Sequence, residues 1–183
     1  MKKNFMRPLQ LRHQDVMQKA DQLYEAVNNL VYEGRASYGK NIKNVDRIIK
    51  FFRGKLFPHM NFDERVIFPF IESHIPKYGP LIQLLIAEHN ELKDNFKILE
   101  NLYKKIKSEK NDTKRQETID KLRDKGIYLF CVIRNHLQGE NESIYKAAQE
   151  QLNEREKREL LSKVSACSCA RNYLNRRGEN RIG

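Results

Sequence analysis

The chain has 183 residues, of which 39% are hydrophobic and 32% charged, and its formal net charge is +11. This length favours a single domain, or a domain with a tail, that is large enough to bury a core. Eight Gly and five Pro favour helices over a turn-rich β fold, and no apolar run approaches the roughly 20 residues that a membrane span needs.

The first predicted element is an amphipathic helix over residues 9–33, because apolar residues recur there at steps of three or four. The segment EGRASYGKN that follows contains two glycines and is expected to break the helix. The stripe on one side of the helix consists of His13, Val16, Ala20, Leu23, Val27 and Leu30.

A second helix is predicted over residues 42–74 and should end at the segment IPKYGP. Pro58 and Pro69 lie inside it. Each should kink or locally break the helix, because proline lacks a backbone N–H and its ring clashes with the preceding turn. The stripe consists of Val45, Ile48, Phe52, His59, Asp63, Val66 and Phe70.

Two further long helices are predicted over residues 81–107 and 113–151, with a polar connector between them. Gly126 and Gly139 should weaken the fourth helix locally. The stripe of the third helix consists of Ile82, Leu85, His89, Leu92, Phe96, Leu99 and Tyr103. The stripe of the fourth consists of Ile119, Leu122, Leu129, Ile133, His136, Glu140 and Ile144.

Four long amphipathic helices with short connectors indicate an all-α fold, an up-down-up-down four-helix bundle. We assign residues 1–151 to this bundle. We assign residues 152–183 to a short helix over residues 154–164 and a basic tail, SACSCARNYLNRRGENRIG. The tail has no clear period, which is typical of a disordered terminus.

Each long helix carries one histidine on its apolar stripe, namely His13, His59, His89 and His136. Asp63 and Glu140 follow two of them at i+4, so each acid shares a helix face with its histidine. At a rise of about 1.5 Å per residue, His13 and His59 lie at similar heights, whereas the other two agree only to within about two helical turns. The fifth histidine, His74, is expected at the surface.

Buried carboxylates are costly unless they are paired or bind a metal. Two carboxylates near four imidazoles therefore favour a pair of cations, bridged by the carboxylates and flanked by the histidines, inside the bundle. Nitrogen and oxygen ligands without thiolate fit iron or manganese, with zinc as a further alternative. The competing interpretation is two separate structural His–acid hydrogen bonds.

The same residues resemble the motifs of the hemerythrin-like, or HHE cation-binding, family. The family motif H-x3-[DE], with an aromatic residue nine positions after the His and then Pro, is matched by His59, Asp63, Phe68 and Pro69. A second copy is matched by His136, Glu140 and Tyr145, with Lys146 in place of the proline.

Two further segments extend the resemblance over residues 9–150. AEHNELKDNF, which contains His89, resembles the family's third-helix EH segment, and LRHQD, which contains His13, resembles its first-helix histidine. Oxygen-carrying hemerythrins have a fifth histidine where this chain has Lys93. The ligand set is more similar to bacterial di-iron proteins linked to iron–sulfur cluster repair, and to the iron-sensing domain of a eukaryotic F-box protein.

The resemblance implies a non-haem di-iron protein with two iron ions per chain, oxo- or hydroxo-bridged. It implies binding of, or reaction with, O2, NO or peroxide in an oxidative or nitrosative stress response or in iron handling. Manganese and zinc are the alternative metals. The implied metal ligands are His13, His59, Asp63, His89, His136 and Glu140.

Some alternatives stay open. Glu64 is adjacent to Asp63 but lies about 100° further round the helix, so we prefer Asp63 as the first bridging acid. A tyrosine could enter an open metal position, but the sequence selects none, and it gives no oligomeric state. The alternative functions are a di-iron enzyme that reduces peroxide or NO, and a basic nucleic-acid-binding protein, which the charge supports but no motif does.

The three cysteines, Cys131, Cys167 and Cys169, do not form a disulfide framework, and the N-terminus lacks the apolar region of a secretory signal. We therefore predict a reducing, cytoplasmic location. Cys131 is expected to pack as a small hydrophobic residue. Cys167 and Cys169 form a C-x-C motif that could receive a thiol, a cluster or a metal, or have no defined role.

Overall fold

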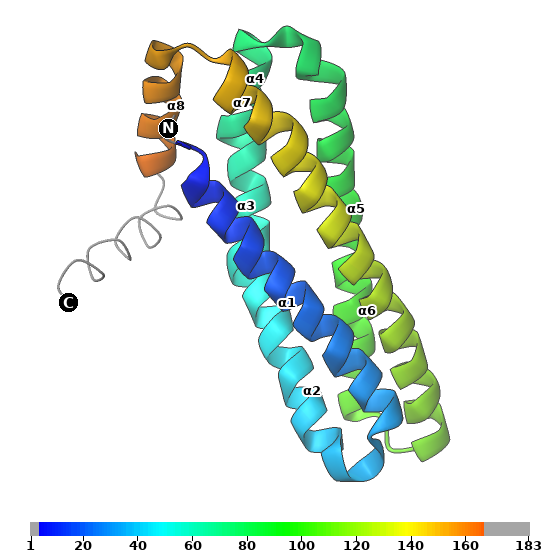
Figure 1. Ribbon diagram of the computed structural model, residues 1–183. Coiled ribbons are helices and arrows are strands. Elements are labelled where there is room, and N and C mark those ends of the chain that lie inside the picture. The colour runs from blue at the N-terminus through cyan, green and yellow to red at the C-terminus, as the bar shows by residue number, and fades with distance from the viewer. Residues whose placement is uncertain (1–3, 167–183) are drawn as a thin grey trace, which may run out of the picture.

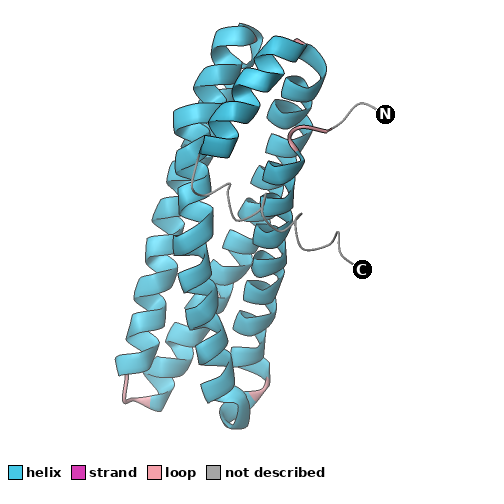
Figure 2. Ribbon diagram, turned by 90° about the vertical axis from the view of Figure 1, so that its left-hand side faces the viewer, coloured by secondary structure: helices cyan, strands magenta, loops and turns pink. Residues whose placement is uncertain are grey.

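The computed structural model describes residues 4–166, apart from the side chains of residues 34–36, and this part of the chain contains helices and no strand. Only short loops separate the helices (Figure 2). The all-α class is therefore confirmed. No helix within residues 4–166 is long and apolar enough to cross a membrane. Cys167, Cys169 and the rest of the predicted tail lie outside the described residues.

The helices form four long rods and a shorter C-terminal helix. The first rod is α1 (Arg7–Tyr32) and the third is α5 (Gly79–Ser108), which the turn η3 (Pro76–Tyr78) precedes. The second rod consists of α2 (Gly34–Phe51), η1 (Phe52–Leu56), α3 (Phe57–Phe62), η2 (Asp63–Ile67) and α4 (Phe68–His74). The fourth rod consists of α6 (Asp112–Glu140), η4 (Asn141–Tyr145) and α7 (Lys146–Gln151), and α8 (Glu154–Ala166) follows it.

The rods lie alongside one another (Figure 1). Helix α1 packs against α2 and α6, and α5 packs against α6. Helix α8 lies beside the first turns of α1 at one end of the molecule and packs against η2. This arrangement brings the apolar stripes of the rods together in a shared interior.

The break between the first two rods is shorter than predicted. Helix α1 ends at Tyr32 and α2 begins at Gly34, so most of the segment EGRASYGKN is helical. The buried side chain of Asn41 donates a hydrogen bond from Nδ2 to Glu33 Oε2 over 2.9 Å, which ties the start of α2 to the turn. Tertiary contacts of this kind outweigh the low helix propensity of Gly39.

The second rod continues through Pro58 and Pro69, where a kink or local break is predicted, because a π-turn precedes each proline. The N–H of Phe57 donates to the carbonyl of Phe52, and the N–H of Phe68 donates to that of Asp63. These wider i→i−5 turns relieve the clash that a proline ring makes with the preceding turn of an α-helix. The rod changes its local geometry without ending.

Two apolar clusters fill the interior, and the stripe histidines lie at the boundary between them. On α1, for example, His13 falls between Leu9 of one cluster and Val16 of the other. The cluster that contains Leu9 also includes Leu160 and Val164 of α8. A layer of polar side chains therefore crosses an otherwise apolar interior.

Candidate metal centre

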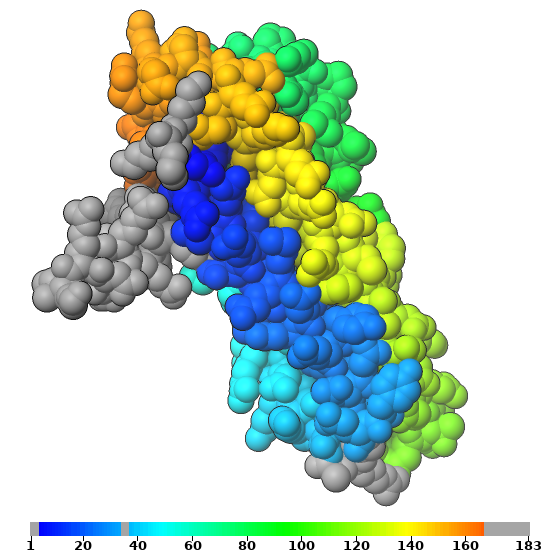
Figure 3. Space-filling view, in the orientation of Figure 1, coloured from blue at the N-terminus to red at the C-terminus, as the bar shows by residue number. Residues whose placement is uncertain are grey.

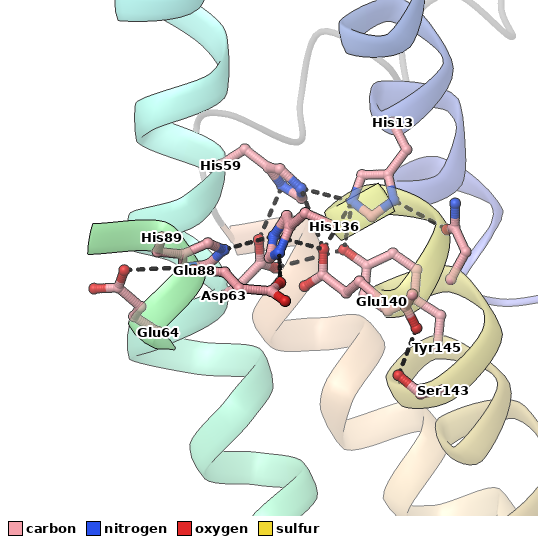
Figure 4. Close-up of polar contacts among 12 residues, drawn as sticks. His13, His59, Asp63, Glu64, Glu88, His89, His136, Glu140, Ser143 and Tyr145 are labelled. Carbon is pink, nitrogen blue, oxygen red and sulfur yellow. Dashed lines mark hydrogen bonds and ion pairs between the residues drawn. The ribbon is translucent and has the colours of Figure 1, made fainter. Parts of the chain in front are cut away.

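All six side chains that the sequence predicts as metal ligands lie in this polar layer. Each is at most 3% exposed, and together they are six of the ten buried polar or charged residues among those described. Figure 4 shows them converging from several helices. They are His13 of α1, His59 of α3, Asp63 of η2, His89 of α5, and His136 and Glu140 of α6.

The four imidazoles meet in two pairs. His13 Nε2 lies 2.6 Å from His59 Nε2, in agreement with the similar heights expected for these residues. His89 Nε2 lies 2.9 Å from His136 Nε2, although the rise of the helices predicts a mismatch of up to two turns. Since α5 and α6 pack along one another, the second pair also meets in direct contact.

The His89–His136 pair is held from outside by two carboxylates. His89 Nδ1 lies 2.9 Å from Glu64 Oε1, and His136 Nδ1 lies 2.7 Å from Glu88 Oε2. A carboxylate accepts a hydrogen bond from the protonated Nδ1, so the lone pair of the ring is on Nε2. Both Nε2 lone pairs of this pair therefore point into the centre.

The His13–His59 pair is held by a neutral amide at His13 and lies close to a buried acid at His59. His13 Nδ1 donates to Asn141 Oδ1 over 3.0 Å, and His59 Nδ1 lies 3.2 Å from Asp63 Oδ2. The oxygen atoms again face Nδ1, so this pair also presents Nε2 to the centre. The support of the two pairs thus differs in charge.

Glu140 lies between the two pairs. Its Oε2 atom is 3.2 Å from His13 Nε2 and 3.9 Å from both His59 Nε2 and His136 Nε2. Donor atoms of His13, His59 and Glu140 all lie within 4.8 Å of one another, close enough to hold one metal ion. Because it also approaches His136, the carboxylate is placed to contact both halves of the centre.

Burial and mutual proximity shift the pKa values of the centre. Burial, with a contribution from His136, lowers the pKa of His89 to about 4. Burial and then His13 lower the pKa of His59 well below its usual value. Burial and the charge of Glu140 raise the pKa of Asp63 well above its usual value. Burial opposes ionisation of Glu140, but His13 and the neighbouring imidazoles lower its pKa overall.

These donors fit metal cations better than they fit one another. Two inward lone pairs at 2.9 Å repel each other, whereas two nitrogen ligands at about 2.1 Å from one metal, at right angles, stand about 3 Å apart. Within residues 4–166, Asp63 Oδ2 and both carboxylate oxygens of Glu140 are buried without a hydrogen bond. Buried carboxylates in this state are costly unless a cation neutralises them.

The structure places Asp63 and Glu64 in different surroundings. Asp63 is fully buried in the centre, whereas the Glu64 side chain is 26% exposed and lies outside His89. Lys93, at the position of the fifth histidine of oxygen carriers, donates from Nζ to Glu64 Oε1 over 2.9 Å. Burial opposes ionisation of Glu64, but its hydrogen bonds with Lys93 and His89 lower the pKa of the carboxyl.

Tyr145 also reaches the centre, a placement that the sequence does not single out. Its hydroxyl lies 3.3 Å from His13 Nε2 and 3.5 Å from Asp63 Oδ1, and its ring stacks on the His13 ring. Burial and the charges of Asp63 and Glu140 raise the pKa of Tyr145 well above its usual value. The phenol therefore keeps its proton at neutral pH.

Sequence reasoning missed the residues behind the imidazoles, namely Glu64, Glu88 and Asn141. The available signal was position, because Glu88 precedes His89 and Asn141 follows Glu140 directly. Metal-binding histidines usually donate Nδ1 to such a group. The polar residues next to each predicted ligand are therefore the first candidates for this role, although each of them supports a histidine on another helix.

Of the two remaining predictions, the one for His74 is correct and the one for Cys131 is wrong. His74 is exposed on α4, as expected, and stacks on Phe70. Cys131 was expected to pack in the interior, but it is exposed. Cys131 is two residues away from both Leu129 and Ile133, which are buried. Residues that are two positions apart in a helix point to opposite faces, so Cys131 faces outward.

The comparison with known proteins agrees with this geometry. The chain matches no curated protein. A family model, the hemerythrin HHE cation binding domain, matches residues 6–148, a span that contains all six candidate ligands and covers most of the chain. This chain belongs to the hemerythrin HHE cation-binding domain family.

Proposed function

We propose that this chain is an up-down-up-down four-helix bundle that holds two non-haem iron ions and binds a small ligand, O2, NO or peroxide. The main support is the arrangement of the two imidazole pairs. Their Nε2 atoms face one another at 2.6 Å and 2.9 Å, and the buried Glu140 lies between the pairs. Two sets of nitrogen donors around a shared carboxylate suit two metal ions in a bundle core. The family match adds cation binding.

In this proposal, each pair of imidazoles holds one ion. His13 and His59 would hold one ion and His89 and His136 the other, with Asp63 and Glu140 as the carboxylate ligands. Imidazole and carboxylate ligands without thiolate favour iron or manganese. When bound, iron supplies redox chemistry and an open coordination position for the ligand.

The side chains around the donors prepare the centre for that chemistry. Glu64, Glu88 and Asn141 fix the ring orientations by accepting from Nδ1. The two apolar clusters on either side exclude water, which strengthens electrostatic interactions inside the centre. The protonated Tyr145 places a hydrogen-bond donor next to the His13–His59 half.

Tyr145 is also the observation that favours a second candidate, an enzyme that reduces peroxide or NO. Such a reduction builds up negative charge on the bound oxygen atoms, and a neutral phenol beside the donor atoms is placed to stabilise that charge by a hydrogen bond. Stopped-flow mixing of the reduced protein with peroxide or NO separates the two functions. Repeated turnover that slows in Tyr145→Phe indicates the enzyme, whereas one stable adduct indicates a binder or sensor.

Metal analysis tests the main proposal. Protein produced with ample iron should contain about two iron ions per chain and show visible absorption that changes on reduction. His89→Ala should lose at least one of the ions. His74→Ala is the matched control, since His74 is exposed on α4 and should not matter. Wild-type protein without bound transition metal would contradict the proposal.

We further propose that the protein works in the cytoplasm, in an oxidative or nitrosative stress response or in iron handling. The support comes from the family and from the proposed ligands. Exposing producing cells to peroxide or to an NO donor, with and without the gene, tests this role. Equal survival of both strains under both stresses and under iron limitation would count against it.

A further inference from the structure

A pocket adjoins the metal centre at the junction of α1 and η4. It has a volume of about 370 Å³ and is lined by Asn4, Gln10, Asn141, Glu142, Tyr145, Lys146 and Gln149. Figure 3 shows the blue first turns of α1 meeting the yellow surface of η4 and α7 on this side. The pocket therefore lies where the N-terminal end of the first rod meets the fourth rod.

Two of the lining residues also contact the candidate metal ligands. Asn141 Oδ1 accepts a hydrogen bond from His13 Nδ1 over 3.0 Å. The Tyr145 hydroxyl is 3.3 Å from His13 Nε2 and 3.5 Å from Asp63 Oδ1. These two side chains form a wall one residue thick between the pocket and the donor atoms.

The π-turn η4 explains how the Tyr145 side chain reaches the wall. In a regular α-helix, the five residues from Glu140 to Tyr145 would turn the chain by about 500°, leaving Tyr145 about 140° away from Glu140. A π-turn rotates less per residue, so Tyr145 returns towards the side of Glu140. π-Turns inside α-helices often occur at functional sites.

The outer side of His89 and two further pockets offer a poorer approach than the Tyr145 side. The outer side of His89 is covered by Glu64, which Lys93 holds in an ion pair, and Phe68 stacks on the ring of His89. Two further pockets, which include Ile48 and Ile119 in their walls, belong to the other apolar cluster, away from the centre. The Tyr145 side combines a pocket with a thin wall.

We propose that this pocket is the entrance to the metal centre, and that Tyr145 is the gate that a ligand passes. The inference rests on the proposed function. Rotation of the Tyr145 ring away from His13 uncovers His13 Nε2 and Asp63 Oδ1. The lining is mostly amides, with one acid, Glu142, and one base, Lys146. The exposed surface of the lining is mostly apolar, so the pocket suits small ligands that are neutral or carry a single charge.

Azide binding to the iron-loaded protein tests the entrance, with the new absorption band followed by stopped flow. Glu142→Trp places a large side chain at the exposed rim without touching the donors. It should slow azide binding and release equally, by about tenfold each, and leave Kd unchanged, because an entrance affects passage and not the bound state. Glu150→Trp is the matched control, an exposed glutamate on α7 outside the pocket, and should change neither rate.

Lys146→Trp provides a second rim variant with the same expected result. Unchanged azide rates in both rim variants, with wild-type helicity and iron content, would overturn the entrance. A change in Kd without a change in the association rate would overturn it too. Iron content is measured first, because it separates failure of the entrance proposal from failure of the proposed function. A wild-type protein that takes up no iron overturns both.

Discussion

The two halves of the centre are alike on the inside and different on the outside. In each half, two imidazole Nε2 atoms face one another at 2.6 Å or 2.9 Å. Behind His89 and His136 stand two partly exposed carboxylates, Glu64 and Glu88. Behind His13 stands the neutral amide of Asn141, and His59 Nδ1 faces the buried Asp63.

This difference gives the halves different chemical roles. A carboxylate that accepts from Nδ1 makes an imidazole a stronger electron donor to a metal, whereas an amide does so less. The His89–His136 half is therefore suited to stabilise the oxidised state of a bound metal. The His13–His59 half, with Tyr145 and the pocket beside it, is suited to receive a ligand.

The largest effect should come from Glu140, which both halves share. Glu140→Gln keeps the shape of the side chain but removes the charge between the pairs. We expect affinity for both ions to fall by more than the roughly 10–100-fold typical of changes behind the ligands. Chelator competition measures this affinity. Glu142→Gln, two residues further along and exposed, should retain wild-type iron content.

The same substitution should destabilise the metal-free protein. The imidazoles around the buried Glu140 lower the pKa of its carboxyl and so stabilise its charge, and removing one partner of such a buried pair costs about 3–5 kcal/mol. Urea unfolding of the metal-free form measures this loss. Retention of one ion at wild-type affinity would show that Glu140 serves only one half of the centre.

The second effect comes from exchanging the supports of the two halves. Glu64→Gln keeps an acceptor for His89 Nδ1 but removes its charge, and Asn141→Asp adds a charge behind His13. We expect the first to weaken iron binding by about tenfold and raise the midpoint potential, and the second to lower the potential. Spectroelectrochemical titration measures the potentials.

Two further variants test whether the supports behind the histidines set the midpoint potential. The double variant, Glu64→Gln with Asn141→Asp, should return towards the wild-type potential, because the opposed changes lie on different rods and add. Asn135→Asp, exposed on α6, should leave the potential unchanged. Shifts of the two single variants in the same direction would mean that the halves do not differ as their supports suggest.

The sequence predicts the inward-facing part of the centre well, because helical periodicity places His13, His59, His89 and His136 on apolar stripes. The 100° step per residue also separates Asp63 from Glu64, and the two acids do lie in different surroundings. Whether the six residues bind metal stays a prediction. The rods themselves follow the same apolar period.

The helix irregularities and the contacts that support the histidines could not be predicted from the sequence. No proline indicates the π-turn η4 in the sequence, since Lys146 stands where the family has Pro. Without that turn, the Tyr145 side chain would point away from the centre. The contact between His136 and Glu88 depends on how α5 and α6 pack, which local periodicity does not encode. Likewise, packing and the Asn41 contact keep α2 helical across Gly39.

The smallest effect should come from Lys93, which touches no candidate ligand but binds the support of one. Its Nζ atom shares Glu64 Oε1 with His89 Nδ1 and partly neutralises that carboxylate. Lys93→Met frees the charge of Glu64 to act on His89, so the midpoint potential should fall. Because the Lys93 side chain is 25% exposed and screened by solvent, we expect about 20–40 mV. Lys97→Met, one turn further along and exposed, should shift it less.

A double-mutant cycle decides whether Lys93 acts through Glu64. In a Glu64→Gln background the carboxylate charge is gone, so Lys93→Met should no longer lower the potential. An equal shift in both backgrounds would mean that the lysine acts on the centre directly through space. If the shift vanishes, Lys93, at the position of the fifth histidine of oxygen carriers, adjusts how strongly His89 donates electrons to a bound metal. The His89–His136 half would then be tuned from the surface, while the His13–His59 half faces the pocket.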